Sequence, residues 1–300
     1  MQFITRKDTI LLENGSLPFK FVSFNIPNLH FIEDPVWHRA TSWEQTDALD
    51  AITQIGGRVI RIYPLSFQKS DKDSTLKHFL IQNGTWILNS ELFQDLDSAL
   101  ALARDRQIRV ILPFIDYWDF WGGIPSFQSA LGLPPDSQSF FQNDISRNAF
   151  KNVVSLVLNR VNSVSGIIYK NDPTILAWET GNELSMNGNR VPLEWTLDMA
   201  RHIKSIDPNH LLMDGSYGKY GWDSQVLSSP LIDIYSNHYY IESLDAGEIC
   251  LLVFLGCILI SSIGLLFGIF RYPYRIFRYF SIDSLYPRQS VRILRFCDCL

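Results

Sequence analysis

Short apolar runs alternate with longer segments of helical periodicity between residues 18 and 240, and this order constrains the fold more than any other feature. Chains with this alternation pack helices against a parallel sheet. The expected strands are 19–24, 59–63, 109–115, 175–179, 211–213 and 232–235. The expected helices are 43–55, 91–105, 147–161, and one that begins at Pro192 and ends before Pro208. We predict an α/β fold of the (β/α)8-barrel type, apparently incomplete, with about six βα units.

The first expected helix carries the clearest local signals. Ser42 and Gln45 have the spacing of a capping box, and Gly56 follows as a stop signal. Its apolar stripe consists of Ala48, Leu49, Ile52 and Ile55. The stretch after residue 63, which is rich in Lys, Asp and Ser, is expected to be a polar loop.

Charge and cysteine placement exclude several classes of protein. The net charge is −5, but residues 271–300 carry six Arg and two Asp, a balance of +4 that leaves −9 for residues 1–270. This acidic body argues against a nucleic-acid partner. All four cysteines lie beyond residue 249, so the barrel region holds neither a disulfide nor a thiolate metal site. The motifs also give no indication of a cofactor, a phosphate-binding loop or a metal centre.

A run without charged residues extends over residues 250–270. As a helix it would be about 32 Å long, enough to cross a bilayer; a fully buried core helix is the alternative. Three arginines follow the run directly and acidic residues precede it, which predicts a single-pass membrane protein with a cytoplasmic C-terminus. The expected parts are a barrel in residues 1–245 that lies outside, the transmembrane helix 250–270, and a basic cytoplasmic tail in residues 271–300.

Both ends of the barrel region depart from what an exported protein with a closed barrel needs. Residues 1–8 are polar and charged and do not have the pattern of a signal peptide. Only ten residues separate the last expected strand end near Tyr240 from the uncharged run, which leaves no room for two further strands. An incomplete or misjoined gene model is therefore one interpretation of this sequence.

Polar and aromatic residues follow the expected strands. The strand 175–179 leads into an Asn-Glu pair at 182–183, which is typical of an acid/base catalyst, whereas a loop-capping Glu is the bland alternative. Barrel enzymes build their sites at the carboxyl ends of strands, where these residues would meet. Indoles that stack on sugar rings, next to carboxylates and amides, would suit a carbohydrate groove. The residues at the strand ends are Asn25, Arg61, Asp116, Trp118, Trp121, Asn182, Glu183, Asp214, His238 and Tyr240.

These motifs together resemble glycoside hydrolase family 5, and most of all its endo-β-1,4-mannanase branch, over about residues 4–240. The matching segments are Phe19–Asn25, Gly57–Arg61, Trp118–Gly123, Leu176–Glu183 and His238–Tyr240. The resemblance implies a retaining hydrolase of the mannan endo-1,4-β-mannosidase type. Its substrate would be a β-linked polysaccharide or oligosaccharide.

The same resemblance implies roles for individual residues. Glu183 would be the general acid/base, and Asn182 would hold the sugar 2-hydroxyl. Arg61 would orient the nucleophilic carboxylate. The remaining residues would line the groove: His238 and Tyr240 around the cleaved bond, and Trp118, Trp121, Asp116 and Asn25 along the sugar subsites.

Retention of configuration needs a second carboxyl group about 5 to 5.5 Å from the first. The resemblance places this nucleophile after a seventh strand. Glu248 follows Tyr240 by only eight residues, too few for a crossover of at least about ten residues, so the nucleophile stays unknown. The alternatives to an active hydrolase are a membrane-tethered carbohydrate-binding protein without hydrolysis and a truncated gene product.

Overall fold

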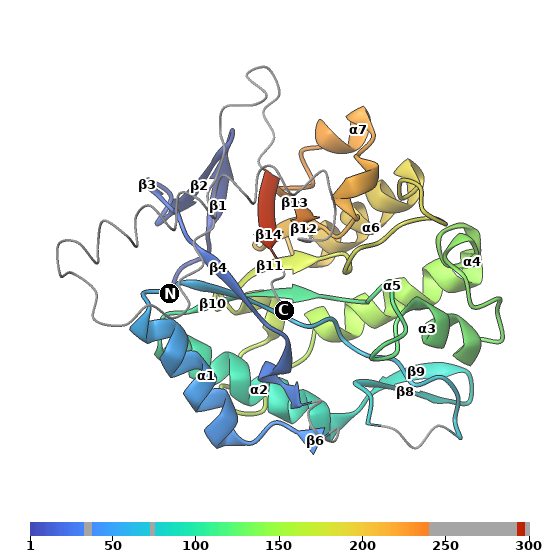
Figure 1. The fold of residues 1–300 in the computed structure, drawn as a ribbon, viewed down its shortest axis with the longest axis horizontal. Helices are drawn as coiled ribbons and strands as arrows, with labels where there is room; N and C mark the ends of the chain where they lie inside the picture. The colour runs from blue at the N-terminus through green and yellow to red at the C-terminus, as the bar shows by residue number, and fades with distance from the viewer. Residues whose placement is uncertain (33–37, 73–75, 240–292, 298–300) are drawn as a thin grey trace, which may run out of the picture.

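A single parallel sheet organises the molecule (Figure 1). The structure is a computed structural model that describes residues 1–32, 38–72, 76–239 and 293–297. The order of the strands in the sheet is β14-β13-β12-β11-β10-β7-β4. Their bounds are β4 (Ser23–Ile26), β7 (Val59–Ile62), β10 (Arg109–Pro113), β11 (Ile175–Glu179), β12 (Leu211–Asp214), β13 (Ile234–Tyr239) and β14 (Ile293–Cys297). From β4 to β13 the neighbours follow chain order, as in a barrel that is not closed, which confirms the predicted alternation of strands and helices.

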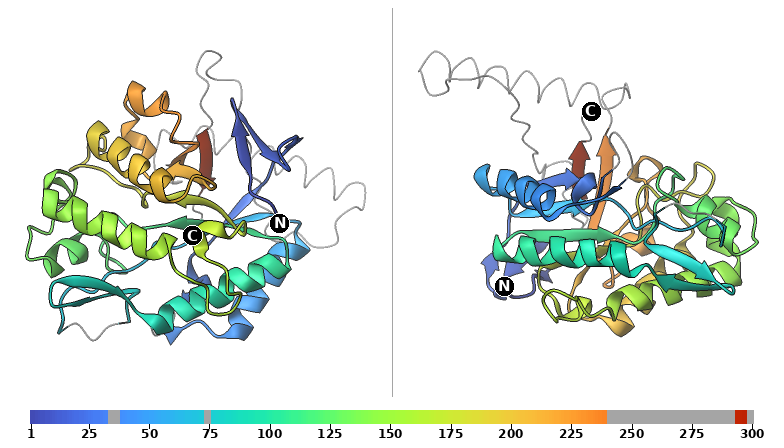
Figure 2. Two further views of the ribbon diagram at one scale, coloured as in Figure 1. Left: turned by 180° about the vertical axis from the view of Figure 1, so that it is seen from behind. Right: turned by 90° about the horizontal axis from the view of Figure 1, so that it is seen from below.

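Helices connect the strands and pack against the sheet (Figure 2). Their bounds are α1 (Ser42–Gln54), α2 (Ser90–Asp105), α3 (Ile124–Ala130), α4 (Ser137–Gln142), α5 (Asp144–Leu158), α6 (Leu193–Ile206) and α7 (Ser224–Leu227). The sequence predicted α1, α2, α5 and α6 to within a few residues. The short helices α3, α4 and α7 were not predicted, because fewer than two turns show no clear periodicity.

The capping box of α1 begins one residue earlier than predicted. Thr41 is the N-cap: its Oγ1 accepts from the backbone N–H of Glu44 at 3.3 Å, and its own N–H donates to the Glu44 carboxylate at 2.8 Å. The same spacing fits Ser42 and Gln45, but a Glu in the first turn also interacts favourably with the helix dipole. Gln45 is buried instead, and its Nε2 donates to the carbonyl of Asp95 at 2.8 Å, which ties α1 to α2.

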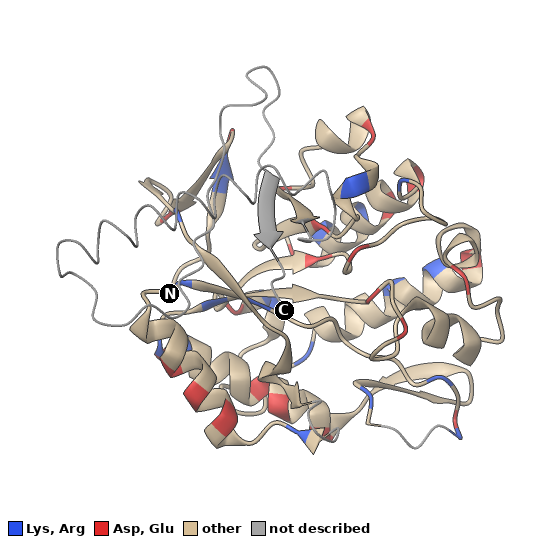
Figure 3. Cartoon of the chain, viewed as in Figure 1, with Lys and Arg blue, Asp and Glu red and all other residues tan. Residues whose placement is uncertain are grey.

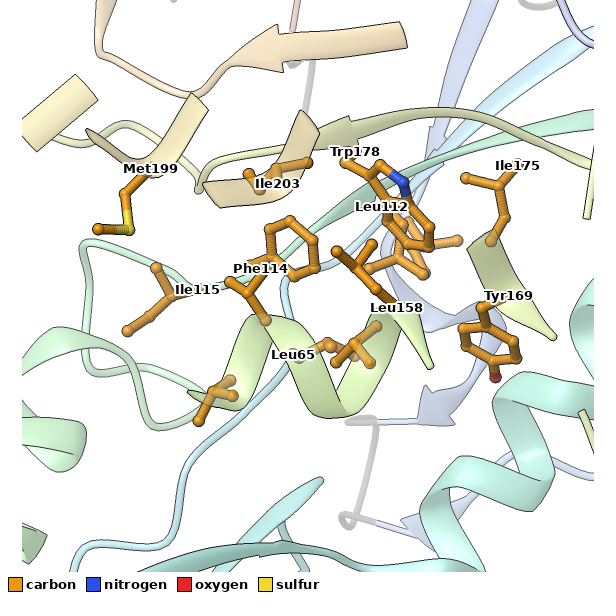
Figure 4. Packing of buried hydrophobic residues seen from close by; sticks show 14 of the residues in the cluster. Leu65, Leu112, Phe114, Ile115, Leu158, Tyr169, Ile175, Trp178, Met199 and Ile203 are labelled. Atoms are coloured by element: carbon orange, nitrogen blue, oxygen red, sulfur yellow. The ribbon is translucent and has the colours of Figure 1, made fainter. Parts of the chain in front are cut away.

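Alternate strand residues face the helices and form the main core (Figure 4). Trp178 of β11 is fully buried on this face and stacks on Phe114, with ring centroids 5.6 Å apart and planes 16° apart. Ile175, Leu112 and Leu158 lie around it in the same cluster. Along β7, β10 and β12 the alternation has a period of two, so the opposite set of strand residues points to the inner face of the curled sheet.

The inner face is closed at its amino end by the N-terminal sheet. This sheet consists of β1 (Thr5–Lys7), β2 (Ile10–Glu13) and β3 (Leu17–Pro18). The inner cluster that it covers contains Ile4, Leu11, Phe19, Val59, Ile111, Leu176, Ala177, Leu211, Met213 and Ile234. Phe19 was expected at the start of the first strand, but β4 begins only at Ser23. Phe19 packs beneath the sheet with the guanidinium carbons of Arg58 and Arg109 4.5 and 5.4 Å from its ring centroid.

The stretch expected to be a polar loop contains a partly buried hairpin. Its strands are β8 (Phe79–Gln82) and β9 (Thr85–Leu88), which pair antiparallel. Phe67, Phe79 and Trp86 are buried, and Phe67 stacks on Phe79 at 4.7 Å. A second small antiparallel pair joins β5 (Phe31–Ile32) to β6 (His38–Arg39). Because many neighbouring residues are polar, the sequence did not indicate strands or aromatic packing in this stretch.

The predicted transmembrane segment 250–270 lies outside the described residues. Among the helices that the structure does describe, none has the length and apolar character needed to cross a bilayer. Residues 293–297, which belong to the predicted cytoplasmic tail 271–300, form β14 and pair in parallel with β13. The placement of residues 250–270 and 271–300 relative to a membrane stays a prediction.

Charged side chains link neighbouring helices on the surface. Asp and Glu residues lie along α1 and α2, while Lys and Arg are spread over several elements (Figure 3). Arg106 donates to Asp50 at 2.6 Å, which joins α2 to α1. Arg39 donates to Asp95 of α2 at 2.8 Å. These ion pairs stabilise the layer of helices that packs against the sheet. The polar residues described next lie at the ends of the sheet strands.

Candidate active site

The inner face of the sheet changes from apolar to charged at the carboxyl ends of two strands. Two residues after the apolar Val59 comes Arg61, and two residues after Ala177 comes Glu179, so each charged side chain shares the inner face. Arg61 is 6% exposed and Glu179 is fully buried. Nε and Nη2 of Arg61 donate to the two oxygens of Glu179 at 2.7 and 2.9 Å, a bidentate ion pair.

Asn182 extends this pair into a chain of hydrogen bonds across three loops. Nη2 of Arg61 also donates to Oδ1 of Asn182 at 2.8 Å. Nδ2 of Asn182 donates to Oδ1 of Asp116 at 2.9 Å. The hydroxyl of Tyr63 donates to Oδ2 of the same carboxylate at 2.8 Å. The ends of β7, β10 and β11 are therefore joined by charged and amide groups rather than by apolar packing.

Glu183 adopts a left-handed backbone conformation, with φ of +53°. This conformation is uncommon for a residue with a side chain, and such strain concentrates at functional sites. The turn is held against the next loop, because the N–H of Leu184 donates to the carbonyl of Gly215 at 2.9 Å. A Cβ on Gly215 would lie only 1.9 Å from the carbonyl oxygen of Gly181, so only glycine permits this approach. The strained turn places Asn182 and Glu183 in succession at one end of the sheet.

The carboxylate of Glu183 is held from two sides. Nε1 of Trp118 donates to Oε2 at 2.8 Å, and Nδ1 of His238 lies 2.8 Å from Oε1. Glu183 is 6% exposed and His238 is 7% exposed. An indole nitrogen can only donate, whereas the imidazole contact needs one proton that either atom can carry. The structure thus brings together three of the residues predicted for the site.

Two further buried carboxyl groups lie at this end of the sheet. Burial raises the pKa of Asp116 to about 6, and the hydrogen bonds from Asn182 and Tyr63 oppose this rise only in part. Burial likewise raises the pKa of Asp214 to about 6, against hydrogen bonds that include those from Ser216 and from Nε1 of Trp222. Both groups change charge near neutral pH, which is common at catalytic sites.

Aromatic rings lead from His238 toward a surface pocket. The ring centroid of Tyr217 lies 6.4 Å from that of His238 and 5.5 Å from that of Tyr220. Burial raises the pKa of the Tyr217 hydroxyl, and the negative charge of Glu183 raises it further. The pocket has a volume of about 330 Å³ and is lined by Gly188, Asn189, Arg190 and Tyr220. The site therefore has a neighbouring hollow on the side of the loops that follow β11 and β12.

The two tryptophans predicted to bind substrate have different surroundings. Trp118 is 51% exposed and offers an indole surface next to Glu183. Trp121 is only 1% exposed, with its ring centroid 5.1 Å from that of Phe31 and 4.5 Å from that of Tyr63. We correct the expectation for Trp121: it supports the site from within and has no free face for a sugar.

Other predicted residues also differ from expectation. Asp116, predicted to bind substrate, is 1% exposed and accepts hydrogen bonds from the protein instead. Arg61, predicted to orient a nucleophile, is paired with Glu179. Asn25 lies within β4, where its Cα is in register with that of Arg61. Tyr240 and Glu248 lie outside the described residues, and the part of the chain that the structure describes holds no group of three or more His, Cys, Asp or Glu placed to bind a metal.

Three residues of the site were not predicted to have a role. Glu179 was expected only as the last strand residue, although its spacing from Ala177 places it on the inner face. Tyr63 follows Arg61 by two residues, and this spacing also places it on the inner face. Tyr217 follows β12 in a loop, and nothing in its spacing marks it.

Sequence comparison provides an independent line of evidence. Residues 133–244 match the profile of a family described as glycoside hydrolase family 5 β-mannosidase-like. This segment is similar to that family. It includes β11, β12 and β13, and with them Asn182, Glu183 and His238.

Curated relatives are mannanases by name. Putative mannan endo-1,4-beta-mannosidase 5 of Oryza sativa subsp. japonica is 38% identical over 148 residues, which are 47% of this chain and 30% of that protein. Putative mannan endo-1,4-beta-mannosidase 4 of Arabidopsis thaliana is 29% identical over 244 residues, which are 78% of this chain and 57% of that protein. The chain therefore spans between about a third and a little over half of the length of these two relatives.

Solved structures with a similar fold also include mannanases. The endo-1,4-beta-mannanase from Rhizomucor miehei superposes with a TM-score of 0.68 at 22% identity, covering 80% of this chain and 72% of that one. The endo-beta-1,4-mannanase from Thermotoga petrophila gives a TM-score of 0.62 at 24% identity, covering 74% and 53%. At these identities the likeness shows the fold alone, and it supports the predicted incomplete (β/α)8-type architecture.

Proposed function

We propose that this chain acts as a retaining glycoside hydrolase of the mannan endo-1,4-β-mannosidase type, with Glu183 as the general acid/base. The observation that carries the proposal is the environment of this carboxylate, held between the indole N–H of Trp118 and Nδ1 of His238. The names of the curated relatives support mannan as the substrate class. The reaction would cleave internal β-1,4 bonds.

The geometry suggests how Glu183 handles a proton. Its Oε2 accepts from Trp118, so the exchangeable proton lies on Oε1 or on Nδ1 of His238. In the first step the protonated carboxyl would donate to the leaving glycosidic oxygen. In the second step the carboxylate would take a proton from water. Proton transfer of this kind contributes about 10²- to 10⁴-fold to a rate.

Asn182 and Trp118 supply the groups that would contact sugar. A carboxamide nitrogen carries two hydrogens, and Asp116 accepts one of those on Asn182. The second would donate to a sugar hydroxyl beside the cleaved bond. The exposed indole of Trp118 would stack on a sugar ring, and the pocket at Arg190 and Tyr220 would accept a neighbouring ring.

The nucleophile is not assigned. Retention requires a carboxylate about 5 to 5.5 Å from that of Glu183. Both oxygens of Glu179 accept from Arg61, and Asp116 accepts from the side chains of Tyr63 and Asn182, so neither carboxylate is placed to attack an anomeric carbon. Arg61, the residue expected to orient a nucleophile, already pairs with Glu179. A second candidate function is therefore carbohydrate binding without hydrolysis.

Reducing-end release from β-mannan by the full chain tests the proposal. Glu183→Gln keeps the size of the side chain and removes its acid/base chemistry, so turnover should fall by about 10³-fold. Glu194→Gln, an exposed position in the first turn of α6, is the matched control and should keep full turnover.

Calorimetry with manno-oligosaccharides separates the two candidates. Binding without turnover by the unmodified chain would support the carbohydrate-binding function instead. Turnover that survives Glu183→Gln would remove Glu183 from its role, and absence of both binding and turnover would exclude both functions.

A further inference from the structure

Asp116 occupies the point where the loops after β10 and β11 meet. The two loops continue the parallel pairing beyond the strands: the N–H of Asn182 donates to the carbonyl of Ile115 at 2.8 Å, and the N–H of Tyr117 donates to the carbonyl of Asn182 at 3.0 Å. Asp116 is 1% exposed between them. The side chain of Asp116 is thus enclosed by the residues that form the site, and it does not face solvent.

The hydrogen bonds of this carboxylate come from residues next to the site. Oδ2 accepts from the hydroxyl of Tyr63 at 2.8 Å. Oδ1 accepts from Nδ2 of Asn182 at 2.9 Å and from the backbone N–H of Trp118 at 3.3 Å. These three donors come from three different loops. Asn182 and Trp118 each have a further link to the site.

The first link fixes the orientation of the Asn182 carboxamide. Arg61 donates to its oxygen and Asp116 accepts from its nitrogen, at 2.8 and 2.9 Å. A flipped amide would place its NH2 group against the guanidinium and its oxygen against the carboxylate, and both contacts would be lost. Asp116 and Arg61 together therefore permit only one orientation, in which the free amide hydrogen is available for substrate.

The second link runs through Trp118 to the acid/base residue. Asp116 holds the backbone N–H of Trp118, and the indole of Trp118 holds Oε2 of Glu183. The loop is tightly folded here, because a Cβ on Gly123 would lie 2.4 Å from the carbonyl oxygen of Asp116 and 2.1 Å from that of Trp118. Since half of the Trp118 side chain is exposed, its position depends on this anchored loop rather than on packing all round.

We propose that Asp116 is a positioning residue, which sets the carboxamide of Asn182 and the indole of Trp118 in the orientations that Glu183 needs. It would act through these two residues and not by contact with the sugar. This inference rests on the proposed function for its catalytic consequence. The geometric part stands on the hydrogen bonds alone.

Within the part of the chain that the structure describes, this carboxylate is buried with no cation bonded directly to it, which supports the proposal. Burial raises the pKa of Asp116 to about 6, and the negative charge of Glu183 raises it as well, while Asn182, Tyr63 and Trp118 lower it. The guanidinium of Arg61 reaches Asp116 through Asn182 and pairs directly with Glu179. A buried carboxylate held by neutral donors weakens the fold at neutral pH, a cost that is typical of functional sites.

Two variants and one control test the role in the full chain. Asp116→Asn keeps one acceptor oxygen, and Asp116→Ala removes both. Asp119→Asn changes an exposed carboxylate in the same loop, which accepts from the backbone N–H of Ser126 and does not contact Asn182. We expect kcat/KM on β-mannan to fall by about 100-fold for Asp116→Ala and about tenfold for Asp116→Asn, chiefly in kcat, since a small misplacement of catalytic groups has effects of this size. Asp119→Asn should match the unmodified chain.

Nuclear magnetic resonance of the Asn182 side-chain amide gives a readout that needs no turnover. With 15N-asparagine labelling, the amide signals that disappear in Asn182→Ala should titrate with a midpoint near pH 6 in the unmodified chain and in Asp119→Asn. They should not titrate in Asp116→Asn. If the chain lacks turnover, the proposed function fails while this titration still decides the geometric inference.

Two results would overturn the inference. One is an Asn182 amide that titrates identically with and without the Asp116 carboxylate. The other is an active chain in which both Asp116 variants keep the kcat and the pH profile of Asp119→Asn. If Asp116→Ala fails to melt cooperatively, the comparison between the two Asn variants carries the test.

Discussion

Asp97 and Asp116 are both buried carboxylates, but they are bound in opposite ways. Asp97 of α2 accepts from Nε and Nη2 of Arg160 at 3.0 and 2.6 Å, from Tyr169 at 2.6 Å, and from Ser163. Burial raises its pKa, but these partners, first of all Arg160, lower it below the usual range. The donors to Asp116 are neutral, and burial raises its pKa to about 6.

This difference separates a structural network from a functional one. In the helical layer a carboxylate receives a guanidinium of its own, so its charge is compensated and stays fixed over the physiological range. At the carboxyl end of the sheet the guanidinium of Arg61 pairs with Glu179, and no cation among the described residues pairs directly with Asp116 or Asp214. The site thus keeps groups that can change charge, and the fold is less stable for it.

Breaking the structural network should have the largest effect on stability. Asp97→Asn leaves the largely buried guanidinium of Arg160 without its counter-charge, which should lower the free energy of unfolding by about 3 kcal/mol at pH 7. Urea denaturation followed by circular dichroism measures this. Asp144→Asn, whose partner Arg147 lies 3.8 Å away at an exposed surface, is the control and should cause little change. A loss for Asp97→Asn as small as that of the control would show that the two networks do not differ as described.

A neutral residue at Asp214 should change stability in a pH-dependent way. The pKa of Asp214 is about 6 in the folded chain and near 3.8 in the unfolded chain, so the folded state binds more protons between these values. Stability from this group is therefore present below about pH 4 and is lost as the pH rises through 6. Asp214→Asn cannot ionise, so relative to the unmodified chain it should gain about 2 kcal/mol between pH 4 and pH 7.

The measurement is urea denaturation of both chains at pH 4 and pH 7. Asp71→Asn, at an exposed position, is the control and should shift both values equally. An Asp214→Asn variant whose difference from the unmodified chain is the same at both pH values would contradict the assignment of Asp214 to the titrating set.

The strands and long helices could be predicted because their signals are local. The apolar stripe of α1 and the buried run of β11 depend only on neighbouring residues, and β11 was placed at its observed bounds. The hairpin of β8 and β9 could not be found, because it is stabilised by Phe67 and Phe127, which are distant in sequence and pack on Phe79 and Trp86. Local sequence patterns do not indicate contacts with residues that are distant in sequence.

The same dependence on distant partners limited what could be predicted about the site. The sequence placed Asn182, Glu183, Trp118 and His238 at strand ends, and the structure brings these four together. It could not show that Asp116 and Trp121 are buried, because their burial comes from Tyr63 and other residues on separate loops. Nor could it show that Arg61 pairs with Glu179, a contact between residues 118 positions apart.

A pair of tyrosine variants gives the finest comparison between the two networks. Tyr169→Phe removes a hydroxyl that donates to Asp97 at 2.6 Å, and Tyr63→Phe removes one that donates to Asp116 at 2.8 Å. Because the pKa of Asp97 is lowered, Tyr169→Phe should cost the same at pH 5 and pH 8. Asp116, with its pKa of about 6, is protonated at pH 5 and ionised at pH 8. A hydrogen bond to an ionised group is stronger than one to a neutral group, so Tyr63→Phe should cost about 1 kcal/mol more at pH 8 than at pH 5.

Denaturant titrations of the two variants at both pH values provide the test, and each tyrosine serves as the control for the other. Both substitutions keep the aromatic ring, so the packing of Tyr63 on Trp121 at 4.5 Å is retained and does not enter the difference. Equal pH dependence in the two variants would mean that Asp116, like Asp97, keeps one charge state throughout the range. In that case the contrast between a compensated structural carboxylate and a titrating one at the site would not hold, because neither carboxyl would change its charge between pH 5 and pH 8.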